Sequence, residues 1–223
     1  MGENRFDIAA FAKEVHENAK AHGWWDEERS DAELRALIHS EWSEALEEAR
    51  AGRPLVWHAC KSVYTDICEL CETCANKANG KTVGLCPLYM EKPEGVAVEL
   101  MDGCIRIMDW CGKLGMMMTN EEPDNQGTLE RLSCEVCGIL TNKTRGVVDP
   151  LAMTMDRVDV ATLVDGLHGC IAKHRTAEHH LDLLCAYGIA CAWVRAQGLD
   201  PVKLMQAKHE YNKSRPYKHG KKF

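Results

Sequence analysis

The sequence has few aromatic residues, and this scarcity bears first on its fold class. Aromatic side chains make up 6% of the 223 residues, and only three of them are phenylalanines. Stretches in which apolar and polar residues alternate, as they do in half-buried strands, are also scarce. Alanine, leucine, glutamate and methionine are plentiful instead, so the composition argues against an all-β protein and predicts an all-α fold.

A long apolar run is likewise missing, and this bears on location. No stretch approaches the roughly 18 apolar residues of a membrane span. The first residues, MGENRFDIAAF, have mixed charge and lack the apolar centre of a signal peptide. Phe6 stands where a myristoylation signal requires serine or threonine. We therefore expect a cytoplasmic protein with no membrane partner, whose 12 cysteines are reduced thiols apart from any that hold a metal.

Positive charge is in the minority, and the sequence contains no glycine-rich phosphate loop. Lysine and arginine number 27 against 34 aspartates and glutamates, which gives a net charge of −7 and a pI near 5.8. A general nucleic-acid binder is more often basic, so no nucleic-acid partner is expected. The missing phosphate loop argues against ATP-driven motor chemistry. An acidic protein that acts on phosphates needs cations at the contact, either metal ions or a local basic patch.

Helical periodicity organises most of the chain. Apolar residues recur at helical spacing over 5–21, 31–52, 93–114, 129–140, 158–174 and 177–197. Ser30 or Asp31 is expected to cap the second of these helices. We expect a catalytic helical half at 1–54 and 92–146, a cysteine-rich insertion at 55–91, and a second helical half with a basic tail at 147–223.

Two acidic helices carry the residues with the clearest chemistry. Glu41 and Glu44 are three residues apart in the second predicted helix, and Glu99 and Asp102 are three apart in the third. Residues at this spacing share a helix face, so two such helices packed side by side bring four carboxylates to one point. Oxygen ligands of this kind favour Mg²⁺ or Mn²⁺ over Zn²⁺.

The alternative is that these acids form ordinary solvated faces. Aspartate and glutamate make up 34 of the 223 residues, so pairs at a fixed spacing also arise by chance. Position favours a metal site, because Glu41 and Glu99 both border apolar stripes. Glu48 and Asp109, each seven residues beyond a member of the two pairs, are interpreted as solvent-facing acids, with a role as further ligands or in orienting water as the alternative.

Three segments of the sequence resemble the MazG-like all-α nucleoside triphosphate pyrophosphohydrolases of phages and bacteria. The strings that carry the resemblance are LIHSEWSEALEEARAG, PEGVAVELMDGCIRIMDWCG and KHEYNKSRPYKHGKKF, in this order. They lie within residues 20–52, 92–115 and 198–223, which together cover under half of the chain. The resemblance implies a helical bundle that cleaves a nucleoside triphosphate between the α and β phosphates, releasing the monophosphate and pyrophosphate.

The resemblance also implies roles for the acidic residues. Glu41, Glu44, Glu99 and Asp102 would ligate Mg²⁺ and form the catalytic centre. The metal ions would neutralise phosphate oxygens and lower the pKa of an attacking water. Chemistry of this kind depends mainly on positioning and on stabilisation of charge.

Basic residues near the C-terminus are candidate substrate ligands. Arginine offers two parallel donors to phosphate oxygens, and lysine offers a mobile point charge. The predicted substrate-binding residues are Lys208, Asn212, Arg215, Lys218, His219 and, as an aromatic group that stacks on a base, Trp25. The first three match the family, which favours a phosphate clamp. The alternatives are a disordered basic terminus and, for Trp24 and Trp25, an anchor in the core.

The second half of the sequence faintly repeats the first. LIHSEWSEA at 37–45 aligns with GLHGCIAKH at 166–174, and VELMDGCIRIMDWCGKLG at 98–115 aligns with LDLLCAYGIACAWVRAQG at 181–198. Three of the four carboxylate positions are then occupied by Cys170, Lys173 and Cys185. This alignment predicts an internal pseudo-dimer with an active front half and a degenerate rear half, or else a homo-oligomer, typically a dimer. Chance similarity between helices is the alternative.

Closely spaced cysteines mark the predicted insertion. Cys68, Cys71, Cys74 and Cys86 form the pattern C-x2-C-x2-C-x11-C. Four thiolates suit a structural Zn²⁺ ion, and three close cysteines with a distant Cys-Pro also resemble iron–sulfur ligation. Reduced thiols without a metal are the alternative.

The sequence therefore predicts an Mg²⁺-dependent or Mn²⁺-dependent enzyme that hydrolyses a nucleoside triphosphate to the monophosphate and pyrophosphate. One alternative is a non-catalytic helical binding module whose cysteine insertion holds a metal. The other is a hydrolase of a different phosphorylated metabolite.

Overall fold

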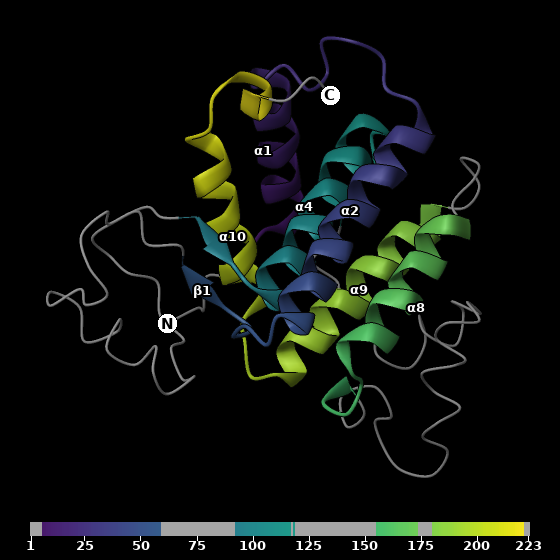
Figure 1. The fold of residues 1–223 in the computed structure, drawn as a ribbon. Coiled ribbons are helices and arrows are strands. Elements are labelled where there is room, and N and C mark those ends of the chain that lie inside the picture. The colour runs from purple at the N-terminus through teal and green to yellow at the C-terminus, as the bar shows by residue number, and fades with distance from the viewer. Residues whose placement is uncertain (1–5, 59–91, 117, 119–154, 174–179, 221–223) are drawn as a thin grey trace, which may run out of the picture.

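Helices make up most of the part of the chain that the structure describes, so the predicted all-α class is confirmed (Figure 1). The computed structural model describes residues 6–58, 92–116, 118, 155–173 and 180–220. The helices in these ranges are α1 (Ile8–Ala21), α2 (Asp31–Arg50), α4 (Val96–Lys113), α8 (Val160–Lys173), α9 (His180–Ala196), α10 (Pro201–Lys213) and the short 3₁₀ helix η3 (Tyr217–Gly220). Two short strands are also described, β1 (Trp57–His58) and β2 (Pro93–Glu94).

Side-chain caps fix where two helices of the site begin. The hydroxyl of Ser30 accepts a hydrogen bond from the backbone N–H of Glu33 at the start of α2. The carboxylate of Asp200 accepts hydrogen bonds from two N–H groups in the first turn of α10, whose first residue is Pro201. Such caps satisfy N–H groups that have no partner inside the helix, and proline suits the first helical position. Both starts are therefore specified locally by the sequence.

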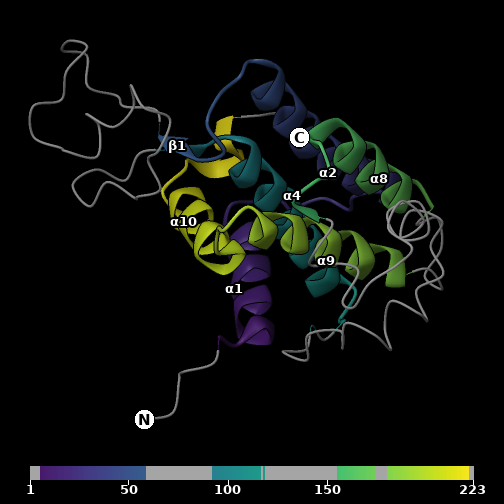
Figure 2. The same cartoon turned by 90° about the horizontal axis from the view of Figure 1, so that it is seen from below.

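α4 is the central helix of the fold. It contacts α1, α2, α9 and α10, and most of its side chains are buried. α1 and α10 lie on one side of it, whereas α8 and α9 lie on the other (Figures 1 and 2). The buried face of each outer helix is therefore covered by α4 or by a direct neighbour of α4.

A glycine allows α2 to approach α4 closely. A Cβ atom on Gly103 would lie 2.2 Å from Nε1 of Trp42, which is too close for a side chain to fit without displacement. The indole N–H of Trp42 donates to the carbonyl oxygen of Leu100 at 3.3 Å. Because Gly103 leaves room for the indole ring, the acidic residues of the two helices come to lie opposite one another.

The helices α8 and α2 begin at equivalent positions of the predicted repeat. Asp159 accepts a hydrogen bond from the N–H of Thr162, as Ser30 does at the start of α2. The capping residues Ser30 and Asp159 are 129 residues apart, and His39 and His168 are separated by the same number. The Nδ1 atoms of these two histidines lie 2.5 Å apart where α2 contacts α8. Residues that the predicted repeat treats as equivalent are thus in contact.

α4 and α9 end in the same way. Gly115 and Gly198 are equivalent in the predicted repeat, and their φ angles are +66° and +76°. The N–H of Gly115 bonds to the carbonyl of Gly112, and the N–H of Gly198 bonds to the carbonyl of Arg195. A left-handed glycine after the last helical residue closes a helix in this manner. Both helices therefore end with a common closing motif, and the internal repeat stays a prediction.

The predicted cysteine-rich insertion leaves and rejoins the fold at a pair of strands. β1 and β2 pair antiparallel, with Trp57 opposite Glu94. The intervening residues 59–91 lie outside the described part of the chain. That range contains the predicted metal ligands Cys68, Cys71, Cys74 and Cys86, so a Zn²⁺ or iron–sulfur site stays a prediction.

Helix α10 is not among the predicted helices. The predicted basic tail begins inside it, and its residues Met205, Lys208 and His209 are buried. The first part of the predicted basic tail, as far as Lys213, is therefore helical, and the alternative of a disordered terminus does not hold there. The predicted helix at 129–140 lies outside the described residues. Within the described ranges, no helix has both the length and the apolar character needed to cross a bilayer.

Candidate metal centre

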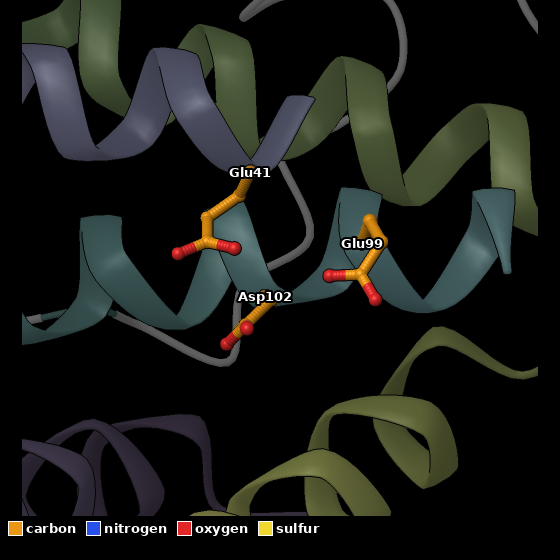
Figure 3. Close-up of side chains that lie close together, drawn as sticks. All are labelled: Glu41, Glu99 and Asp102. Carbon is orange, nitrogen blue, oxygen red and sulfur yellow. The ribbon is translucent and has the colours of Figure 1, made fainter. Parts of the chain in front are cut away.

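Three of the four predicted carboxylates converge between α2 and α4. Glu41 comes from α2, and Glu99 and Asp102 come from α4 (Figure 3). One carboxylate oxygen of each residue lies within 4.8 Å of the others. All three side chains are buried, with exposed fractions of 6%, 1% and 7%. Three oxygens at this spacing can face one divalent cation.

Helix periodicity explains why these acids point inward. Glu41 lies on the same buried stripe of α2 as Ile38, Trp42 and Ala45. Glu99 and Asp102 are three residues apart on α4, so they share a face of that helix. Apolar neighbours thus carry the carboxylates into the interior, where their burial costs free energy unless cations compensate the charge.

The fourth predicted ligand, Glu44, does not join this cluster. Its side chain is exposed, and it is not among the three residues whose oxygens converge. Although Glu44 is three residues from Glu41, the buried stripe of α2 continues through Trp42 and Ala45 instead. The described cluster therefore contains three of the four predicted ligands, and Glu44 lies outside it on the exposed side of α2.

Lys208 of α10 lies within the acidic cluster. Its Nζ atom is 3.1 Å from Oε2 of Glu99 and 3.3 Å from Oδ2 of Asp102, and the residue is 1% exposed. Asn212, one turn later on α10, donates from Nδ2 to Oδ1 of Asp102 at 3.4 Å. These two predicted phosphate ligands thus contact the carboxylates directly, and α10 helps to hold the cluster together.

Arg106 is a residue of the site that the sequence prediction missed. Its Nη2 and Nε atoms donate to Oε1 of Glu41 at 2.9 and 3.1 Å. Its position in the sequence is the signal that points to it. Arg106 is a basic residue flanked by Ile105 and Ile107 in an apolar stretch, and it lies one turn after Asp102. A charged residue in such a stretch needs a partner of opposite charge.

Burial makes two of the carboxylates difficult to ionise. Burial raises the pKa of Glu41, and the nearby Asp102 raises it further, while Arg106 opposes both effects. Burial raises the pKa of Glu99 to about 8, although Lys208 opposes the change. Glu99 is therefore protonated at neutral pH when no other cation is bound.

Asp102 differs from its two neighbours. Burial alone would raise the pKa of Asp102, but Lys208 and Arg106 outweigh burial and hold that pKa below its ordinary value. Burial lowers the pKa of Lys208, but Asp102 and Glu99 reverse this and raise it above the ordinary value. Asp102 and Lys208 therefore form an ion pair at neutral pH.

The donor set and the charges fit a hard divalent cation. Lys208 and Arg106 bring two positive charges to a group of three carboxylates. When all three carboxylates are ionised, one negative charge stays uncompensated among buried oxygen atoms. Such a group favours a hard cation that oxygen ligands hold. The cluster of Glu41, Glu99 and Asp102 can therefore bind a metal ion.

A pocket lies beside the cluster and shares Asp102 with it. Its walls come from α1, from α4, from α10 and from the segments that follow α1 and α10. Besides Asp102, the polar and aromatic residues of these walls are Asn18, Trp24, Arg106, Asp109, His209, Asn212 and Arg215. The pocket therefore places several polar side chains beside the candidate cation site.

Trp25 contacts Asp109, a residue of the pocket wall, without lining the pocket itself. The Nε1 atom of Trp25 donates to Oδ1 of Asp109 at 2.8 Å, and Nδ1 of His16 lies 2.7 Å from the same oxygen. The interpretation of Asp109 as a solvent-facing acid is therefore wrong. Trp25 is not among the residues that line the pocket, and the tryptophan in its wall is Trp24.

Glu48 is also anchored rather than solvent-facing. Its two carboxylate oxygens accept hydrogen bonds from Nη1 of Arg53 and Nε1 of Trp57, both at 2.7 Å. Glu48 thereby joins the end of α2 to the strand β1. Neither Glu48 nor Asp109 lies in the cluster of converging carboxylates.

The remaining predicted substrate ligands fall in different places. Arg215 lines the pocket. Lys218 donates its backbone N–H to the carbonyl of His22 at 2.9 Å, and its Nζ atom lies 5.9 Å from the ring centre of Tyr217. It is not among the residues that line the pocket. The side chain of His219 lies outside the described part of the structure.

Comparison of the chain with models of protein families, with curated proteins and with solved structures found no match. No relative therefore assigns a role to the cluster of Glu41, Glu99 and Asp102. Its chemistry is inferred from the geometry of these carboxylates and of the pocket beside them.

Proposed function

We propose that this chain is an Mg²⁺-dependent nucleoside triphosphate pyrophosphohydrolase of the MazG-like all-α type. The observation that carries the proposal is the convergence of Glu41, Glu99 and Asp102 beside a pocket that contains Arg106 and Arg215. A cation site next to such a pocket suits a ligand that joins a phosphate chain to an organic group. The motifs by which the sequence resembles this family supply the three carboxylates.

The side chains of the site act mainly by positioning. Bound at the three carboxylates, Mg²⁺ would supply neutralisation of phosphate charge and acidification of an attacking water. Arg106 orients Glu41 through two hydrogen bonds, and Lys208 spans Glu99 and Asp102. Phosphoryl transfer depends on this kind of fixed geometry.

Two further residues extend the proposed machinery. Arg215 lines the pocket and can donate to phosphate oxygens in a bidentate manner. Glu44 stays a candidate fourth ligand, because it lies one turn from Glu41 and its exposed side chain can rotate toward the cluster.

We extend the proposal to an internal pseudo-dimer. The pair α8–α9 packs against α2–α4, and the contact between His39 and His168 joins positions that are equivalent in the alignment. Because Cys170, Lys173 and Cys185 replace carboxylates in the second copy, one chain has one active site. The rear half then completes the bundle as a second subunit does in a dimer.

Pyrophosphate release from a panel of ribo- and deoxyribonucleoside triphosphates tests the proposal. Pyrophosphate and the monophosphate are expected in equal amounts with Mg²⁺ present, and neither is expected after chelation. Inclusion of nucleoside diphosphates and phosphorylated sugars separates this activity from that of a hydrolase of another phosphorylated metabolite. Release of orthophosphate alone, or no release from any substrate, would contradict the proposed reaction.

A non-catalytic binding module is the alternative that one observation favours. Lys208 already supplies a cation to the acidic cluster, as it would in a centre that is purely structural. In such a structural centre Lys208 would neutralise the carboxylates, so the centre would bind no Mg²⁺. The protein would then release no product from a triphosphate. The same substrate panel therefore decides between them.

A further inference from the structure

α4 presents a row of polar residues to the pocket. Asp102, Arg106 and Asp109 follow one another at spacings of four and three residues, so they lie along one face of the helix. Asp102 belongs to the cation site, and Asp109 is seven residues and roughly 10 Å further along the axis. A nucleotide with its phosphates at the cluster can reach Asp109 with its base.

The pocket also has apolar and aromatic lining. Val15 and Ala19 of α1 and Ile105 of α4 supply apolar surface, and Trp24 supplies an aromatic group. Pockets for planar ligands typically combine such surfaces with a few fixed polar atoms. The polar atoms at the Asp109 end therefore decide which ring is accepted.

Asp109 is held in one orientation and keeps one oxygen available. Its Oδ1 atom is engaged by Trp25 and His16, at 2.8 and 2.7 Å. Among the described residues, Oδ2 makes no hydrogen bond. A carboxylate can only accept, so a ligand group that contacts Oδ2 must be a donor.

Asn212 provides a second acceptor in the same pocket. Its Nδ2 atom donates to Asp102, and this fixes the amide orientation, because the reversed amide would place two oxygens against each other. The Oδ1 atom of Asn212 is buried and has no hydrogen-bond partner within the described part of the chain. Buried acceptors without a donor cost free energy, which a ligand with donor groups recovers.

We infer that Asp109 is a specificity-determining residue that selects nucleobases carrying an exocyclic amino group. This inference rests on the proposed function. Cytosine and adenine present an amino donor where uracil and hypoxanthine present a carbonyl oxygen. The fixed carboxylate of Asp109 attracts the amino group and repels the carbonyl oxygen, so the two classes differ in both binding and turnover.

Two matched pairs of substrates test the inference directly. The kcat/KM of the full-length protein is measured with Mg²⁺ for dCTP against dUTP and for dATP against dITP. Each pair differs in the amino or oxo group and in the hydrogen on the adjacent ring nitrogen. We expect the amino member to be preferred by about tenfold or more, the scale of a hydrogen bond to a charged group. Equal values within both pairs would overturn the inference.

The variant Asp109→Asn supplies the second arm of the test. Its amide oxygen can still accept from Trp25 and His16, while its amide nitrogen presents a donor to the pocket. The preference is expected to fall by about tenfold or to reverse. Glu17→Gln, an exposed substitution on α1, is the matched control and is expected to leave both ratios unchanged. A ratio that Asp109→Asn does not alter would overturn the inference.

A binding measurement separates this inference from the proposed function. Calorimetric titration with the α,β-imido analogues of dCTP and dUTP does not depend on turnover. If neither triphosphate is hydrolysed but the dCTP analogue binds more tightly and Asp109→Asn removes the difference, the proposed reaction fails and the base selection stands. If triphosphates are hydrolysed but the two analogues bind equally, the base selection fails and the proposed reaction stands.

Discussion

The Nζ atom of Lys208 lies 3.1 Å from Oε2 of Glu99, and both side chains are almost fully excluded from solvent. The two residues are 109 positions apart in the sequence, so the contact joins the C-terminal helix α10 to the central helix α4. The protein therefore carries a cation of its own at the place where a divalent metal is proposed to bind. If a metal binds there, its binding and the stability of α10 are expected to be linked.

Substitution of Lys208 should expose this link. Lys208→Met leaves Glu99 and Asp102 without their cationic partner, and loss of one partner from a buried pair typically costs about 3 kcal/mol or more. Thermal unfolding in a chelator is expected to show a lower Tm than that of the parent protein. Mg²⁺ should raise the Tm of the variant by more than it raises that of the parent, because it replaces the missing charge.

The control for this experiment is Lys203→Met on the same helix. The Lys203 side chain is 78% exposed, so its loss should leave the Tm nearly unchanged with or without Mg²⁺. An equal response of the Lys208 and Lys203 variants to Mg²⁺ would show that Lys208 and the metal do not occupy a common site.

Mg²⁺ binding should strengthen as the pH rises toward 8. The pKa of Glu99 is raised to about 8 in the folded, metal-free protein, from an ordinary value of 4.5. Between pH 4.5 and about 8, Glu99 is protonated in the folded protein and ionised in the unfolded chain. The free energy of unfolding therefore falls as the pH rises through this range. A metal needs the ionised carboxylate, so binding expels the proton.

Calorimetry in buffers of different ionisation enthalpy measures this exchange. We expect Glu99 to release about one proton per Mg²⁺ at pH 6 to 7, and the Kd to fall by about tenfold per pH unit below pH 8. Glu99→Gln should lower the release by this one proton, because among the three carboxylates only Glu41 also has a raised pKa. Binding that is independent of pH in the parent protein would contradict the assignment of Glu99 as a ligand.

Removal of single ligand charges should stop turnover without unfolding the protein. Glu41→Gln and Asp102→Asn keep side-chain volume, and each is expected to lower kcat by about a hundredfold or more, the scale on which one charge-stabilising group acts. Circular dichroism checks that the helical fold is retained. Glu47→Gln, an exposed change on α2, is the control and should keep the activity of the parent. Full activity in either ligand variant would remove that residue from the centre.

The approach of α2 to α4 can be tested with a pair of glycine substitutions. A Cβ on Gly103 meets the Trp42 indole at 2.2 Å, whereas a Cβ on Gly188 in α9 meets nothing within 4 Å. Gly103→Ala should therefore lower the free energy of unfolding by about 1–3 kcal/mol. Gly188→Ala should raise it by up to about 1 kcal/mol, because alanine favours the helix. Equal effects in denaturant titrations would argue against this close packing.

Much of the helical architecture could be predicted from local signals in the sequence. Ser30 caps α2 and Gly115 follows the end of α4, and both signals depend only on neighbouring residues. α10 was harder to predict, since its basic residues are typical of an exposed tail. Asp200 and the proline that follows it are nevertheless a local signal for the start of a helix.

The composition of the site could be predicted only in part. The spacing of Glu99 and Asp102 correctly places both on one face, because helix geometry is local. Whether Glu44 or Glu48 follows Glu41 into the interior depends on which side of α2 packs against α4, and this is a property of the tertiary structure. The partners Lys208 and Arg106 depend on it in the same way, since neither lies near Glu41 or Glu99 in the sequence.

Binding of Mn²⁺, followed by electron paramagnetic resonance, shows whether Glu41, Glu99 and Asp102 jointly hold a divalent cation. The parent protein should bind Mn²⁺ in a form that Mg²⁺ displaces, and Asp102→Asn should lose this binding while Glu47→Gln retains it. If the parent leaves all added Mn²⁺ free in solution, or if Asp102→Asn binds it as tightly as the parent, the proposed cation site is contradicted.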